Sequence, residues 1–128
     1  MIALETAAQW SLEVERGPDC LLVKLGGRFH EDPHRIRLAD QLWDLLRQHF
    51  TYRLVVQLGD IDFLTTYVLR ELITVAERVC AQGGMMRLCS LSRRDAKVLR
   101  RCAARSELPA YGSRQDALFS RAPARLPR

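Results

Sequence analysis

The chain has 128 residues, of which 48% are hydrophobic and 27% charged, as expected for one globular domain with its own apolar core. No apolar run approaches the roughly 18 residues that a membrane-spanning helix needs. The first residues also lack the basic-then-apolar layout of a signal peptide. We therefore expect a single cytoplasmic domain that does not insert into a membrane.

The cysteines and histidines show no spacing typical of metal ligands, because the sequence contains no CxxC pair and no Cys/His cluster. Reduced thiols in or near a core are expected instead of a disulfide framework or a zinc site. The sequence also lacks a GxGxxG fingerprint, a Walker loop and a nucleophile elbow. It therefore predicts no enzyme activity, no metal and no other cofactor.

The net charge of +5 raises the question of a nucleic-acid partner. Much of the basic excess lies in Arg93–Arg105 and in the tail Arg114–Arg128. Surfaces that bind nucleic acid usually combine clustered cations with aromatic or base-reading side chains, and few aromatic residues lie among these arginines. A solvated basic face or an acidic protein partner is favoured, and nucleic-acid binding remains a weaker hypothesis.

The N-terminal part of the chain predicts a β-hairpin. Residues 1–9 are expected to form a lead-in. Trp10–Arg16 alternates apolar and polar residues as a half-buried strand does, and Cys20–Leu25 continues as a second strand. Between them, Gly17, Pro18 and Asp19 are turn-forming residues.

A helix and a buried strand are expected next. Asp32 followed by Pro33 is a typical helix start, and apolar residues at three- and four-residue spacing predict a helix to about Phe50. The short, apolar and β-branched segment Arg53–Leu58 then indicates an interior strand.

The second half of the chain predicts two helices around a further strand. An apolar face from Leu69 to Cys80 predicts a helix that stops at Gly83 and Gly84. Met85–Leu91 is expected to be a strand.

The segment Ser92–Asp95 is a capping-box pattern that opens a third helix, whose inner residues should be Ala96, Leu99 and Ala103. A short extended piece over Pro109–Gly112 and a second capping box, Ser113–Asp116, precede a last short helix.

After the hairpin, strands and helices alternate along the chain, which predicts an α/β fold. We expect one domain over residues 10–120, with a four- to five-stranded mixed sheet and about four helices. Proline and arginine dominate residues 121–128, which indicates a flexible basic tail.

Two threonines fall where the interior strand ends and the second helix begins. The first turn of a helix has unpaired N–H groups and the positive end of the backbone dipole. Thr65 and Thr66 can therefore serve as a helix cap or as a site that holds a phosphate.

This turn, Asp60–Leu69 (DIDFLTTYVL), resembles a motif of the STAS domain of bacterial anti-sigma factor antagonists, which runs Gly-Val-x-Phe-(Leu/Met)-Asp-Ser-Ser/Thr-Gly-Leu. The resemblance covers roughly residues 10–120. Three further segments are similar to passages of that family: Gly27–His30 (GRFH), Cys80–Leu88 (CAQGGMMRL) and Tyr111–Leu118 (YGSRQDAL).

The resemblance implies a regulatory protein-binding module without catalytic activity. In the family, a partner kinase that is also the anti-sigma factor phosphorylates the serine after the aspartate, and only the unmodified domain binds that partner. The matching phosphoacceptor is Thr66, with Thr65 as the other candidate. The partner-binding residues implied around this turn are Arg28, His30, Asp62, Thr65, Thr66, Tyr67 and Arg70.

The chain departs from the family motif at several of these positions. Thr65 replaces the aspartate, Tyr67 replaces a small hydroxyl residue, and Val68 replaces the glycine. Arg28 and His30 stand where the family often has acidic residues, a change that suits a nearby anion.

The sequence leaves a second function open. A STAS-like subunit without a switch could act as a scaffold in a larger complex or as an accessory to a transporter, and Thr66 would then only cap the helix. Whether copies of the chain associate with one another is also left open.

Overall fold

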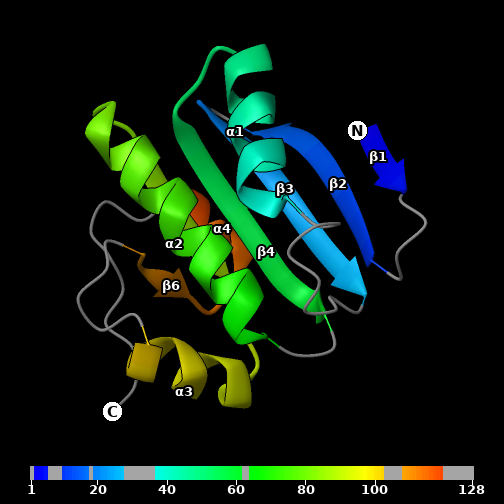
Figure 1. Ribbon diagram of the computed structural model, residues 1–128, viewed down its shortest axis with the longest axis vertical. Coiled ribbons are helices and arrows are strands. Elements are labelled where there is room, and N and C mark those ends of the chain that lie inside the picture. The colour runs from blue at the N-terminus through cyan, green and yellow to red at the C-terminus, as the bar shows by residue number, and fades with distance from the viewer. Residues whose placement is uncertain are drawn as a thin grey trace.

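One mixed β-sheet organises the molecule (Figure 1). The computed structural model describes residues 2–5, 10–17, 19–27, 37–61, 64–102 and 108–119. The strands lie side by side in chain order, antiparallel from β1 to β3 and parallel from β3 to β6. They are β1 (Ile2–Glu5), β2 (Trp10–Gly17), β3 (Cys20–Gly27), β4 (Arg53–Ile61), β5 (Met85–Cys89) and β6 (Ala110–Tyr111).

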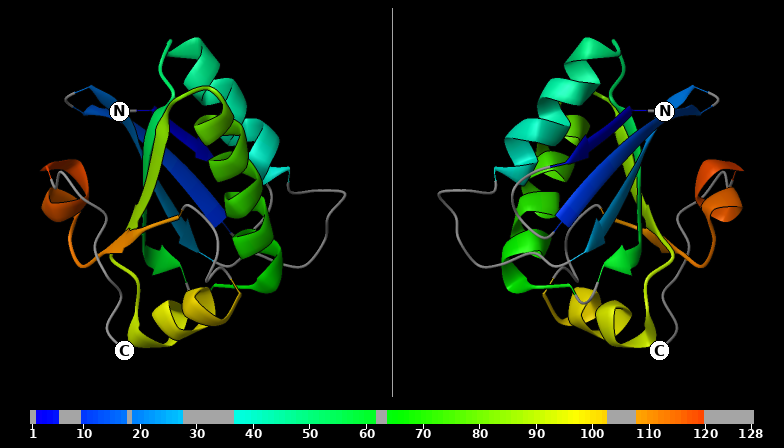
Figure 2. Two further views of the ribbon diagram at one scale, coloured as in Figure 1. Left: turned by 90° about the vertical axis from the view of Figure 1, so that its left-hand side faces the viewer. Right: turned by 90° about the vertical axis from the view of Figure 1, so that its right-hand side faces the viewer.

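Helices lie on both faces and at one end of this sheet (Figure 2). Two helices, α1 and α2, pack side by side on one face, α4 covers part of the other face, and α3 lies at the end where β4 leads into α2. Their bounds are α1 (Leu38–Gln48), α2 (Thr66–Ala81), α3 (Arg93–Cys102) and α4 (Arg114–Phe119).

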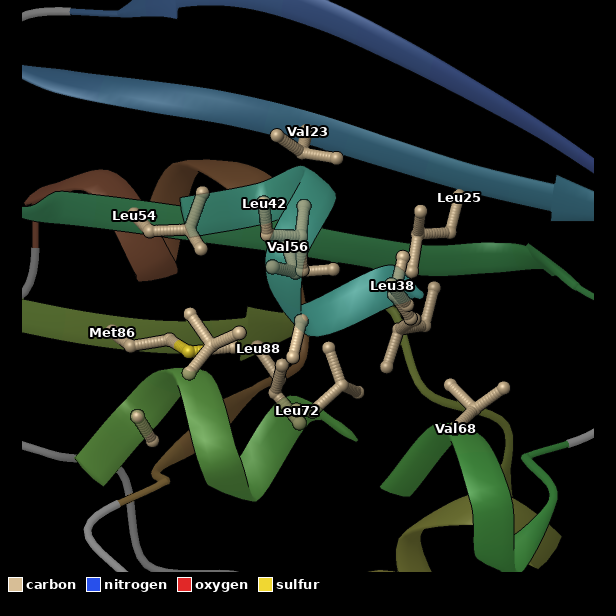
Figure 3. Packing of buried hydrophobic residues seen from close by; sticks show 14 of the residues in the cluster. Val23, Leu25, Leu38, Leu42, Leu54, Val56, Val68, Leu72, Met86 and Leu88 are labelled. Atoms are coloured by element: carbon tan, nitrogen blue, oxygen red, sulfur yellow. The ribbon is translucent and has the colours of Figure 1, made fainter. Parts of the chain in front are cut away.

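The main core fills the space between the sheet and the pair α1 and α2 (Figure 3). Alternate residues of each strand point toward the helices, because successive side chains of a strand face opposite sides. A smaller cluster under α4 contains buried residues that point to the other face of the sheet: Cys20, Leu22, Val55, Cys89 and Tyr111. The ten labelled residues of the main core in Figure 3 are Val23, Leu25, Leu38, Leu42, Leu54, Val56, Val68, Leu72, Met86 and Leu88.

The α/β class and the mixed sheet predicted from the sequence are confirmed. Over the described residues the sheet has six strands, one more than the expected range, because Ile2–Glu5 pairs antiparallel with β2 inside the segment expected to be a lead-in. The predicted hairpin is present as β2 and β3. The predicted last short helix is α4.

The predicted start of the first helix is wrong. Asp32 and Pro33 lie outside the described residues, and Arg37 has a non-helical backbone (φ −103°, ψ 63°), so α1 begins only after it. The Arg37 side chain forms no capping hydrogen bond. Instead, the Glu71 carboxylate of α2 accepts a hydrogen bond from the Ala39 N–H at 3.3 Å. A contact between helices therefore provides the acceptor for an N–H group in the first turn of α1, a role that a local cap residue normally fills.

Two glycines end α2 and lead directly into β5. Gly83 has a left-handed backbone (φ +74°), and the Gly84 N–H donates to the Val79 carbonyl at 2.9 Å. These are features of a Schellman motif with glycine at the left-handed position. The predicted stop at this pair is confirmed.

Thiol labelling tests the burial of the second cluster. Cys20, Cys80 and Cys89 form no disulfide; Cys20 and Cys89 are buried, whereas Cys80 is half-buried. Burial raises the pKa of the Cys20 and Cys89 thiols above the ordinary value of 9.0, and the thiolate is the reactive form. A thiol reagent should therefore label Cys80 before Cys20 and Cys89, and peptide mapping by mass spectrometry measures the order of these three.

The same shift has a consequence for stability. Folding favours the protonated thiols, so the stability they contribute is present below pH 9.0 and is lost as the pH rises through the raised pKa values. Labelling of native Cys20 or Cys89 as fast as Cys80 would contradict this arrangement.

Candidate functional site

The turn that leads into α2 places the two adjacent threonines in different environments. Thr65 has an extended backbone (φ −78°, ψ 159°) and is the N-cap residue: its Oγ1 accepts a hydrogen bond from the Val68 N–H at 3.1 Å. Its exposed fraction is only 8%. The idea that Thr66 caps the helix is therefore wrong, because Thr65 fills that role.

Thr66 is the first residue of α2 and is exposed to solvent. It lies at the positive end of the helix dipole, and the first turn of α2 contains no acidic side chain. The Thr66 hydroxyl is thus accessible from solvent at a position that favours an added negative charge.

A buried carboxylate fixes this turn to α3. Asp95 is only 3% exposed, and its Oδ1 accepts a hydrogen bond from the Leu64 N–H at 2.9 Å. The Asp95 N–H in turn donates to the Ser92 Oγ at 3.1 Å, which is half of the predicted capping box.

Sequence reasoning missed the role of Asp95. The predicted inner residue Leu99 is buried, but Ala96 is only half-buried and Ala103 lies outside the described residues. The aspartate of the capping box takes an inner position because it satisfies a backbone donor of a neighbouring loop. Nothing in the local pattern Ser92–Asp95 indicates that partner.

Tyr67 is tied to the helix pair. Its hydroxyl lies 3.2 Å from the Glu71 Oε1, the same oxygen that accepts from the Ala39 N–H of α1. Arg70, four residues after Thr66, is exposed on the same side of α2. The structure therefore brings Thr66 and Arg70 together on the accessible face, with Tyr67 half-buried beside them.

The remaining predicted partner-binding residues, Arg28, His30 and Asp62, lie outside the described residues. Nearby, Asp60 is part of β4 and forms an ion pair with Lys24 of β3 at 3.0 Å. The hydrogen bond from Lys24 to Asp60 raises the pKa of the lysine. Asp60 thus belongs to an exposed ion pair of the sheet. It lies near the turn, but we assign it no role in the site.

Within the described ranges, no group of three or more His, Cys, Asp or Glu side chains could hold a metal ion. Nor does any helix of these ranges combine the length and apolar character needed to span a membrane.

The separation of the two threonines predicts different costs of substitution. Thr65→Ala should lower the free energy of unfolding by about 1 kcal/mol because it removes the helix cap. Thr66→Ala, at an exposed position without a capping bond, should change it by less than about 0.5 kcal/mol. Urea unfolding followed by circular dichroism measures both. Equal costs, or a larger cost at Thr66, would contradict the assignment of the cap.

Comparison with known proteins places this geometry in a structural class. No protein-family model matches the sequence, and no curated protein matches it either. Solved structures do match: the chain has the fold of the STAS domain found in anti-sigma factor antagonists.

Three of the similar structures illustrate the match. An anti-sigma factor antagonist from Mycobacterium paratuberculosis aligns with a TM-score of 0.71 at 18% identity, over 90% of this chain and 96% of that one. A STAS domain protein from Planctomyces limnophilus gives 0.68 at 19% identity, over 84% and 94%. The phosphorylated form of the Bacillus cell fate determinant SpoIIAA gives 0.62 at 13% identity, over 83% and 95%. At such identities the likeness establishes the fold alone.

Proposed function

We propose that this protein is a non-catalytic regulatory module that binds a kinase-type or other signalling protein through the surface around Thr66. Phosphorylation of Thr66 releases the partner. The observation that supports the proposal is that the two threonines of the turn differ: Thr65 is buried as the helix cap, while Thr66 is exposed to solvent.

The physical effect of the modification supports a switch. A phosphate adds about −1.5 to −2 charges and three acceptor oxygens. The N-terminus of α2 can hold such a group, because its free N–H groups and its dipole favour an anion. In a fitted interface, the same charge and bulk would oppose docking. One similar structure, SpoIIAA of Bacillus, is described in both a phosphorylated and an unphosphorylated form.

The docking surface in this proposal is centred on α2. Thr66 and Arg70 supply its exposed polar part, and Tyr67 supplies an aromatic edge that its bond to Glu71 holds in place. From the sequence alone we also propose Arg28, His30 and Asp62 as partner-binding residues; they lie outside the described residues. The cytoplasm is the location that we propose for this interaction.

The test compares partner binding by Thr66→Asp and by Thr66→Ala. Aspartate mimics the added charge and is well tolerated at a helix N-terminus, so the variant should fold normally. Gln115→Glu, an exposed position on α4, adds the same charge on the opposite face of the sheet and serves as the matched control.

Each variant is used for affinity capture from the source cells, and calorimetry then measures the affinity of the captured signalling protein. Wild type, Thr66→Ala and Gln115→Glu should bind it, and Thr66→Asp should bind it about tenfold more weakly or not at all. Equal affinity of all four proteins would contradict the switch and favour the scaffold function.

A further inference from the structure

Helix α3 carries a row of exposed cations along its outer side. Arg93, Lys97 and Arg101 follow four-residue spacing, so they lie on one face of the helix, about 6 Å apart along its axis. All three are exposed. We call these three residues the α3 cation row.

Folding of the domain does not need this row. Leu99 and Asp95 fix the inner side of α3, with exposed fractions of 1% and 3%. Like charges at four-residue spacing repel one another and weaken the helix. No ion pair with a carboxylate among the described residues neutralises the row. The one acidic residue of α3, Asp95, is buried and already bonded to the backbone of another loop.

Helix α3, which carries the row on its outer side, lies beside the turn that presents Thr66. The 2.9 Å bond between Asp95 and the Leu64 N–H joins the first turn of α3 to a residue only two positions before Thr66. Figure 1 shows α3 next to the beginning of α2. Arg93 is the first residue of α3, where the positive end of the helix dipole adds to its charge.

A shallow hollow on this surface gives a partner a place to lie. Its volume is about 430 Å³. Among the described residues, those that line it are Arg93, Arg94, Lys97, Val98 and Arg101, of which Val98 is half-buried and the others are cations. The chemistry that complements such a hollow is a segment with several carboxylates.

We propose that the α3 cation row docks an acidic, Asp- and Glu-rich segment of the same protein partner that contacts the Thr66 turn. The identity of that partner rests on the proposed function, but the chemistry of the row does not. An acidic protein segment is favoured over nucleic acid because α3 (RRDAKVLRRC) has no aromatic side chain for base stacking. The row adds long-range attraction and fixes the orientation of the partner.

The test uses a fluorescent oligoglutamate peptide as the probe, and a short duplex DNA as the rival ligand. The variant of the row combines Arg93→Gln, Lys97→Gln and Arg101→Gln; glutamine is a good helix former, and thermal unfolding verifies that the variant is folded. The control combines Arg16→Gln, Arg47→Gln and Arg53→Gln. These exposed cations lie away from α3, and their removal lowers the net charge equally.

Fluorescence anisotropy at low salt should show peptide binding by the wild type and by the control, and about tenfold weaker binding by the row variant. Added salt should weaken the specific binding, as expected for exposed charges. Absence of binding by the wild type, equal binding by the two variants, or tighter row-dependent binding of DNA than of the peptide would each overturn the proposal.

The two proposals fail separately in these experiments. If the captured partner releases on Thr66→Asp substitution but binds the row variant like wild type, the row proposal fails and the switch stands. If Thr66→Asp binds the partner as tightly as wild type while the row still binds the peptide, the proposed switch fails and the acidic-segment site stands.

Discussion

Replacing Gly84 by alanine should lower the free energy of unfolding by about 3 kcal/mol, because the new methyl group has no space. A Cβ atom at Gly84 would lie 2.1 Å from the Tyr52 carbonyl oxygen and 2.6 Å from the Tyr52 Cβ. The same carbonyl accepts the Met85 N–H at 2.9 Å, so relief of the clash would separate the beginnings of β4 and β5. Rotation of a side chain cannot relieve a contact with a backbone atom.

Gly83→Ala is the matched control for this substitution. A Cβ atom at Gly83 would meet nothing within 4 Å, so only the left-handed backbone (φ +74°) opposes it. The expected cost is about 1 kcal/mol. Urea unfolding of the two variants measures the difference. A cost at Gly83 that equals or exceeds the cost at Gly84 would contradict the close approach of the two strands.

Asp95→Ala should destabilise the protein by about 2 to 3 kcal/mol, because it leaves a buried backbone donor without a partner. The Leu64 N–H loses its 2.9 Å acceptor. Asp95→Asn retains a carbonyl oxygen and should cost less than alanine. The turn before α2 should also become less rigid, and hydrogen exchange of the Leu64 amide measures that change directly.

Asp116 offers a closely matched control. It occupies the same place in the capping box of α4, where its N–H donates to the Ser113 Oγ at 3.2 Å, but its side chain is exposed. Asp116→Ala should therefore change the free energy of unfolding by only about 0.5 kcal/mol. Similar losses for Asp95→Ala and Asp116→Ala would show that the bond to Leu64 contributes nothing to stability.

The features predicted correctly from the sequence are those with local causes. Helix α2 follows from an apolar face with a hydroxyl cap at one end and glycines at the other. The buried strand β4 follows from a short β-branched segment. The sequence does not separate the two threonines of this turn: the structure gives the cap to Thr65 and leaves Thr66 exposed.

Features that depend on distant residues could not be predicted in this way. The beginning of α1 depends on the Glu71 carboxylate of another helix. The end of α1 is local, with the Thr51 N–H bonded to the Leu46 carbonyl, but it lacks the usual sequence signal: Phe50 takes the left-handed position (φ +53°) that glycine usually occupies, and it is 96% exposed. The partner of Asp95 lies 31 residues away in the sequence.

Phosphopeptide mass spectrometry of the protein from its native cells tests the central claim most directly. We predict a phosphate on the hydroxyl of the exposed Thr66 and none on Thr65, which is buried and whose oxygen is bonded to the Val68 N–H. Spectra in which the peptide that contains both threonines is never phosphorylated, or carries its phosphate on Thr65, would contradict the account.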